Sequence, residues 1–151
     1  MNQDDANIIV DFTNSLLESG NLRLKASAEP TDDEGFKVQV RGDDVAILLG
    51  HNAEVLDALE YLGNRVLTKA KDEETRINFD SGNYRARREK ELRLMAEKAA
   101  EKVRTTKIPF TFDPMNSNER RLIHLALSED SSVRTESTGG GENRKVTIYP
   151  A

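Results

Sequence analysis

The sequence predicts an α+β protein made of two small domains, one over residues 4–80 and one over residues 81–151. Segments whose apolar residues recur at helical spacing are mixed with short segments in which every second residue is apolar. A length of 151 residues suffices for two such units with a modest core each. The charge also changes sign near Ser81. Residues 1–80 hold 17 acidic and 8 basic residues, a balance of −9, whereas the rest hold 10 acidic and 14 basic residues, a balance of +4. This asymmetry indicates two units with different partners.

The first unit is expected to run in the order α-β-β-α-α-β. A helix is predicted over residues 4–19, because Ile8, Phe12 and Leu16 recur at helical spacing, with Ile9 and Leu17 beside them, before Gly20 ends the pattern. Turn residues and glycines delimit the other elements. These are strands at residues 22–28, 36–41 and 75–80 and helices at residues 43–49 and 53–69, the last with Val55, Leu59, Leu62 and Val66 on its apolar face.

The second unit is expected to begin with a long helix from about Asn83. Its narrow apolar stripe consists of Leu92, Met95, Ala99 and Val103. A strand at 107–112 follows, with Ile108, Phe110 and Phe112 inward. The next element is a helix at 114–127, whose start carries a capping box of Asn116 and Glu119. Two strands at 132–137 and 144–149 complete the unit, joined by the glycine-rich hairpin loop 138–143.

Composition excludes several classes of site and location. The absence of cysteine rules out disulfides and thiolate metal sites and fits a reducing cytosol. The first ten residues are acidic where a secretory signal is basic, and no apolar run approaches the ~20 residues of a membrane span. We therefore expect a cytoplasmic protein that is not inserted in a membrane and binds no metal or cofactor.

The chemistry-bearing residues do not suggest an enzyme. There are two histidines and no Gly-x-Ser-x-Gly motif, so little nucleophilic chemistry is available. The run "GGGENRK" lacks the spacing of a phosphate-binding loop that ends in Gly-Lys-Ser/Thr. We expect no catalytic residues.

Gly50 stands between two predicted helices, in the stretch "ILLGHNAEVL". It is interpreted in two ways: as a helix-ending glycine that tolerates positive φ, or as a platform on which a phosphodiester lies against the main chain, helped by the free N–H groups of the next helix. Spacing alone favours the first interpretation.

Arg120 and His124 stand one helical turn apart in "NERRLIHLAL". An arginine grips a phosphate in a fork, and an adjacent imidazole stacks or donates to a phosphate. The alternative is that His124 is a core or boundary residue. Arg121, Arg144 and Lys145 would extend the same basic surface.

The predicted bridging helix carries a basic cluster of Arg85, Arg87 and Arg88, continued by Lys90 and Arg93. Such a run is usually a solvated helix face, but here it lies in the half with the positive balance. Tyr84 is placed either to stack on a base or to pin the start of the helix.

The element order of the first unit, with Gly50-His51-Asn52-Ala53 between its middle helices, resembles the type II KH domain. That resemblance implies a clamp for about four nucleotides of a single strand. Ala53 replaces the second glycine of the Gly-x-x-Gly motif, and His51 occupies a position that is commonly Lys or Arg. Because of these two departures, we expect the fold to be kept and the phosphate affinity of this link to be reduced.

The second unit, through "DPMNSNERRLIHLAL" and "VRTESTGGGENRKVTIYP", resembles the domain named for its Arg-x-x-x-His (R-three-H) motif. With the bridging "GNYRARREKELRLMAEKAAEKV", nearly the whole chain is similar to the bacterial Jag family, also called KhpB or SpoIIIJ-associated. Many relatives carry an extra N-terminal segment and linker, whereas this sequence is expected to start at the KH-like unit.

The resemblance implies a non-catalytic protein that binds single-stranded RNA, or single-stranded DNA, chiefly through its C-terminal domain. It further implies post-transcriptional regulation linked to cell elongation, division and shape. The implied protein partner is a small stand-alone KH protein, or a second copy of the chain bound through the KH-like unit. The alternative is a protein-interaction scaffold whose KH-like unit has lost RNA and serves dimerisation or partner binding.

Overall fold

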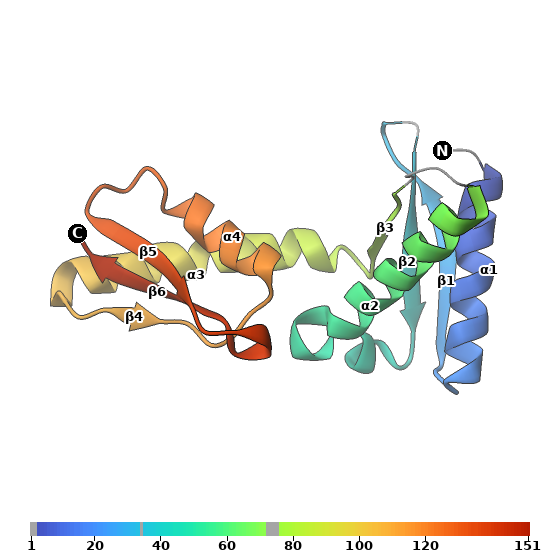
Figure 1. Ribbon diagram of the computed structural model, residues 1–151, viewed down its shortest axis with the longest axis horizontal. Helices are drawn as coiled ribbons and strands as arrows, with labels where there is room; N and C mark the ends of the chain where they lie inside the picture. Colours follow the sequence, from blue (N-terminus) through green and yellow to red (C-terminus); the bar gives the residue numbers. More distant parts are fainter. Residues whose placement is uncertain (1–2, 34, 72–75) are drawn as a thin grey trace. The chain divides into compact units, whose positions relative to one another are not determined.

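The computed structural model describes residues 3–33, 35–71 and 76–151, and its chain divides into two compact units, residues 1–84 and 85–151 (Figure 1). Each unit combines helices with a small three-stranded sheet. The predicted α+β class with two small domains is therefore confirmed.

The first unit contains two helices and three strands. They are α1 (Gln3–Ser19), β1 (Leu24–Pro30), β2 (Phe36–Gly42), α2 (Val45–Lys71) and β3 (Asn78–Asp80). The sheet order is β1-β2-β3, with β1 antiparallel and β3 parallel to the central strand. Helix α1 packs along β1, and α2 packs against α1 and β3 (Figure 1).

The apolar core of this unit lies between the two helices and the sheet. Ile9 and Leu17 of α1 and Leu56 of α2 are fully buried in it. Gly63 allows the close approach of α2, because a Cβ there would stand 3.0 Å from Phe79 and 3.3 Å from Ile9. A side chain at this position would push α2 away from both neighbours.

The buried faces of α1 and α2 agree with the predicted apolar patterns only in part. Ile8 and Leu62 were expected to face inward, but they are 37% and 42% exposed. Ile9 and Gly63 are buried instead. Ile9, Leu17 and Leu59 of the predicted patterns are buried, so the prediction was wrong only at Ile8 and Leu62. Adjacent apolar residues make helical spacing fit two neighbouring orientations.

The predicted pair of helices at 43–49 and 53–69 corresponds to α2. Within Val45–Lys71, two helical segments meet at a kink, where the four residues from Gly50 to Ala53 have non-helical dihedral angles. The order α-β-β-α-α-β is thus present, with a sharp interruption in place of a loop. The start of the predicted strand at 75–80 lies partly outside the described residues.

The second unit packs two helices on one face of an antiparallel sheet. Its elements are α3 (Tyr84–Thr106), β4 (Phe110–Thr111), α4 (Ser117–Ala126), β5 (Val133–Thr138), the 3-10 turn η1 (Gly141–Asn143) and β6 (Lys145–Pro150). The strand order is β4-β6-β5, which makes β5 an edge strand.

Alanines allow α3 to pack closely on this sheet. Ala96 and Ala100 are completely buried beside Leu92 and Val103. Met95, which the sequence placed in this stripe, is 38% exposed, because the buried face follows the 92, 96, 100 and 103 positions. Ile108 was also expected to be inward, but it is 67% exposed and precedes the two-residue strand β4.

The predicted capping box of α4 is half formed. Asn116 is the N-cap, and its side chain accepts the N–H of Glu119. The carboxylate of Glu119 accepts from Arg88 at 2.7 Å. Glu119 therefore joins α4 to α3.

Glycine is required at the predicted hairpin loop. Gly139 has φ +94, and a Cβ there would stand 2.7 Å from the Asn143 carbonyl oxygen.

Across the described residues, no helix combines the length and the apolarity needed to cross a bilayer.

Candidate nucleic-acid interface

The first candidate surface is the interruption of α2. Gly50 has φ −63 and ψ 157, and the three residues after it, His51, Asn52 and Ala53, have φ between 50 and 61. Left-handed backbone costs an L-residue other than glycine about 1 kcal/mol or more, and asparagine tolerates it best. Backbone of this kind persists where the surrounding structure holds it, which is often at a functional site.

Gly50 is not a glycine required by positive φ, so that interpretation of it was wrong. Its φ is negative, and a Cβ placed on it would meet no atom within 4 Å. Neither the backbone conformation nor the packing demands glycine here. What remains is open space over the main chain, into which another molecule can approach.

The sequence predicted that Ala53 is the first residue of a helix, and this prediction was wrong. It is left-handed, and its side chain belongs to the core with 1% exposure. His51 is exposed, whereas Asn52 is half-buried. The link is therefore anchored at one end by a buried methyl group and exposed at its centre.

Acidic residues flank this link, as the sequence indicated. Asp44 accepts from the Arg23 guanidinium at 2.8 Å and from the Arg23 main-chain N–H at 2.7 Å. The side-chain hydrogen bond from Arg23 is the main cause that holds the pKa of Asp44 below its usual range. Asp44 is therefore held as an anion, with its charge offset by the Arg23 guanidinium.

The second candidate surface centres on His124 of α4. Its Nδ1 lies 2.6 Å from Thr135 Oγ1, and its Nε2 lies 2.8 Å from Ser137 Oγ. The ring is half-buried, neither free nor part of the apolar core. Burial first, and the charge of Arg120 second, lower the pKa of His124.

The two hydroxyl groups determine what His124 can do. A neutral imidazole has one N–H and one acceptor nitrogen, so one hydroxyl accepts from the ring and the other donates to it. Neither nitrogen is left to donate to a phosphate. The ring can still present its face or edge to a base.

Arg120 is held by the main chain before α4. Its Nη1 donates to the Met115 carbonyl at 2.7 Å. The N–H of Met115 in turn donates to the carbonyl of Arg144 at 3.1 Å. The structure thus joins Arg120 to the start of β6, where Arg144 and Lys145 are exposed. Arg121 is exposed on α4.

Thr135 and Ser137 are the site residues that sequence reasoning missed. They stand two apart on β5, so they point to the same face of the sheet, toward α4. The alternation in "VRTES" was the signal available, because it places the two hydroxyls on the side of buried Val133.

The basic cluster of the bridging helix is largely engaged within the chain. Arg88 is paired with Glu119 and Glu91, and its side chain is 21% exposed. Arg93 is paired with Glu89 at 2.8 Å. Arg85 is half-buried, whereas Arg87 is exposed.

Tyr84 packs against the core of the first unit. This packing supports the interpretation that Tyr84 pins the start of α3.

In the described part of the chain, no group of three His, Asp or Glu residues is placed to hold a metal ion.

Comparison with known proteins identifies the domain of the C-terminal unit and relatives along most of the chain. The family model of the R-three-H domain matches residues 90–150. The chain is 36% identical to the RNA-binding protein KhpB of Clostridium symbiosum over 140 residues, which cover 92% of this chain and 63% of that protein. It is 34% identical to the RNA-binding protein KhpB of Bacillus subtilis over 114 residues, 74% of this chain and 55% of that protein. The chain thus spans between half and two thirds of these relatives' length.

Proposed function

Because the chain belongs to the KhpB (Jag) family and carries an R-three-H domain, we propose that it binds single-stranded RNA without catalysing a reaction. The observation that carries the proposal is the Arg120–His124 pair, with His124 fixed by two hydroxyls of β5. The C-terminal unit is the principal binding surface. Single-stranded DNA offers the same phosphates and bases and is a second ligand of this surface.

Arg120 supplies the phosphate contact in this proposal. One of its guanidinium N–H groups is used by Met115, and this bond orients the planar fork. The remaining N–H groups are donors for a phosphate, and Arg144, Lys145 and Arg121 add positive charge around it.

His124 supplies a flat apolar surface that is mostly uncharged at neutral pH. Its ring is held in one orientation before RNA arrives, so little side-chain freedom is lost on binding. A base that stacks on it gains the sequence-independent attraction that single-strand binding proteins use.

The α2 link contributes a weaker contact of the same kind. Gly50 leaves the main chain open, and His51, Asn52 and Ala53 follow it in the family motif. The acidic balance of this unit opposes phosphate. In the bridging helix, Arg87 is exposed and extends the RNA surface most readily, whereas half-buried Arg85 does so less. Arg88 contributes least, because two carboxylates engage it.

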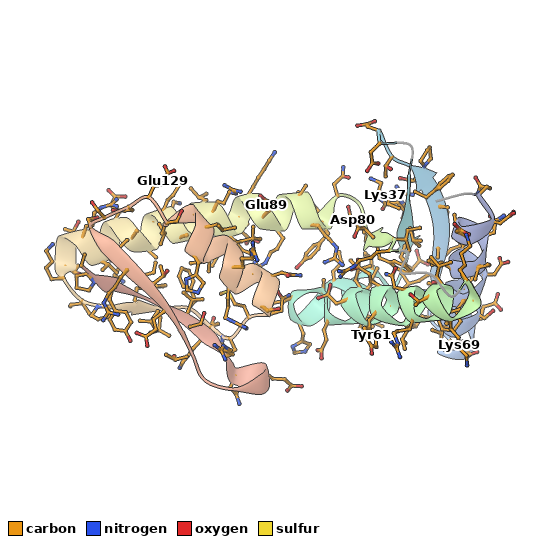
Figure 2. The ribbon with its side chains drawn as sticks, turned by 45° about the horizontal axis from the view of Figure 1, so that its top comes forward. Lys37, Tyr61, Lys69, Asp80, Glu89 and Glu129 are labelled. Carbon is orange, nitrogen blue, oxygen red and sulfur yellow. The ribbon has the colours of Figure 1, made fainter. Side chains whose placement is uncertain are left out.

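A second candidate function for the first unit is protein binding. Ile47, Tyr61 and Leu62 of α2 are 52%, 65% and 42% exposed, and Tyr61 is labelled on this helix in Figure 2. Tyr61 and Leu62 are adjacent on the segment after the kink and Ile47 lies before it, and exposed apolar side chains of this kind favour a protein partner where they gather. A small stand-alone KH protein, or a second copy of this chain, fits this role.

The cellular purpose that we propose is cytoplasmic post-transcriptional regulation connected with cell elongation and division.

The test is a titration of the full chain with a random single-stranded RNA at several salt concentrations. Arg120→Ala should weaken binding and flatten the log–log salt dependence by about 0.7, the share of one phosphate contact. Glu129→Ala is the matched surface control and should leave the slope unchanged. Absence of binding at low salt would refute the proposal and leave protein binding as the function.

A further inference from the structure

The sheet of the second unit has an outer face that its own helices do not cover. Helices α3 and α4 pack on the face that holds Val146 and Ile148, and α3 passes behind β5 and β6 in Figure 1. Side chains alternate along a strand, so the other residues face outward. The outward positions are Thr111, Arg134, Glu136, Thr138, Lys145 and Tyr149, with Thr147 of the central strand buried among them.

Arg134 and Tyr149 form a stacked pair on this face. They are cross-strand partners, and the guanidinium carbon of Arg134 lies 4.2 Å from the centroid of the Tyr149 ring. The Arg134 side chain is 60% exposed, so the guanidinium plane covers the ring and remains accessible. Glu136 accepts from Arg134 at 3.3 Å on the same exposed face.

The position of β5 connects this pair with the Arg120–His124 site. Because β5 is an edge strand, its two faces meet at a free rim of the sheet. Thr135 and Ser137 hold the His124 ring from the inner face. Arg134 is the immediate neighbour of Thr135 and projects from the outer face. A strand that leaves His124 and crosses this rim meets Arg134 next.

We propose that Arg134 and Tyr149 form a base-stacking subsite for an unpaired nucleotide adjacent to those bound at Arg120 and His124. The proposal rests on the proposed RNA-binding function and extends its path over the β5 edge. The base stacks on the exposed guanidinium plane, and the Tyr149 ring supports that plane from below. Lys145, on the same outer face, supplies positive charge for the neighbouring phosphates.

The test compares full-length variants in binding to a fluorescein-labelled random single-stranded RNA. Tyr149→Leu should weaken binding about fivefold or more, because one stacked base contributes that much or more. Tyr149→Phe keeps the ring and should bind as the wild type does. Arg134→Gln should weaken binding too. The matched control is Lys102→Gln, which removes an equal charge from a cation that also lies over an aromatic ring, that of Phe110 at 5.7 Å.

A second RNA, of equal length with abasic residues, tests whether the contact is to a base. The wild type and Tyr149→Leu should bind this RNA equally, because phosphates remain and bases are gone. Melting temperatures are measured for each variant. If Tyr149→Leu weakens binding to both RNAs equally, or only in proportion to lost folded protein, the subsite is refuted.

Arg120→Ala distinguishes failure of this subsite from failure of the proposed function. If Arg120→Ala weakens binding while Tyr149→Leu and Arg134→Gln do not, RNA binding stands and the stacking subsite is refuted. If the wild type does not bind RNA at all, both proposals fall. If both sites contribute to different nucleotides, the fold-losses of Arg120→Ala and Tyr149→Leu should multiply in the double variant.

Discussion

Arg88 and Glu119 form an ion pair between two helices of the second unit, with Arg88 Nε 2.7 Å from Glu119 Oε1 and side chains only 21% and 6% exposed. The other carboxylate oxygen of Glu119 is buried and makes no hydrogen bond within the described residues. This pair fixes the start of α3 against the start of α4, the helix that carries Arg120 and His124. Arg88, which the sequence suggested as a nucleic-acid ligand, therefore stabilises the helix that carries the Arg120–His124 site.

Arg88→Ala should lower the free energy of unfolding by about 3 kcal/mol, because it leaves a buried carboxylate without its cation. Arg87→Ala, on the exposed neighbour, should change it by less than about 0.5 kcal/mol. Urea unfolding of both variants measures the difference. Equal small effects would mean that the pair does not stabilise the helix junction.

His124 should make stability depend on pH. Its folded pKa is lowered from 6.5 by burial and by Arg120, so the unfolded chain takes up a proton first as the pH falls. The stability it contributes is complete above pH 6.5 and is lost as the pH falls through the lowered folded value. His124→Gln removes this titration. The difference in unfolding free energy between wild type and His124→Gln should therefore shrink on acidification, and a constant difference would contradict the assignment.

Removal of the β5 hydroxyls tests whether they position the His124 ring. Thr135→Val and Ser137→Ala each remove one hydrogen bond and should lower the free energy of unfolding by about 1 kcal/mol. RNA affinity should fall in both, because the ring is no longer held. Thr138→Val, on the outer face of the same strand, is the control. Ring nitrogen NMR shifts of His124 report the lost bonds directly, and unchanged shifts would show that the hydroxyls do not bind the ring.

The sequence predicted the secondary-structure order of both units, but not the rotation of their helices. In α1 the pattern of Ile8, Phe12 and Leu16, with Ile9 and Leu17 beside it, predicted the helix, and Ile9 and Leu17 are the members that are buried. Adjacent apolar residues make two orientations equally consistent with the pattern. The choice between them is made by contacts with strands distant in sequence, which periodicity does not contain.

The sequence likewise predicted residues of the candidate site but not the contacts that position them. The spacing of Arg120 and His124 placed them on one helix face, but their hydrogen-bond partners come from β5 and from the segment before α4. The left-handed backbone of residues 51–53 had only a weak local signal, because histidine and asparagine adopt this conformation more often than most residues but alanine prefers helix. Tertiary structure imposes it, through the burial of Ala53.

His51→Lys combined with Ala53→Gly should strengthen RNA binding by the first unit. The lysine adds a phosphate contact, and glycine removes the strain of an alanine at φ 61. The gain from relieved strain, about 1 kcal/mol, is offset by loss of a buried methyl worth about 0.8 kcal/mol, so stability should change little. Affinity is measured in an Arg120→Ala background, which weakens the contribution of the second unit and makes a gain in the first unit easier to detect. Unchanged affinity with an intact fold would favour protein binding by this link.

Gly50→Ala separates stability from ligand binding at the same link. Gly50 has a negative φ, and a Cβ on it meets no protein atom within 4 Å, so the substitution should leave the melting temperature unchanged or slightly higher. If a phosphodiester lies against this main chain, the added methyl group stands in its way, and RNA affinity should fall although the fold is intact. Gly63→Ala is the opposite control: its Cβ would press on Phe79 and Ile9, so it should destabilise the unit first. Thermal unfolding and RNA titration of both variants in the Arg120→Ala background decide the matter. A Gly50→Ala protein with wild-type stability and wild-type affinity would exclude backbone contact with RNA at Gly50 and leave the exposed apolar face of α2 as the working surface of the first unit.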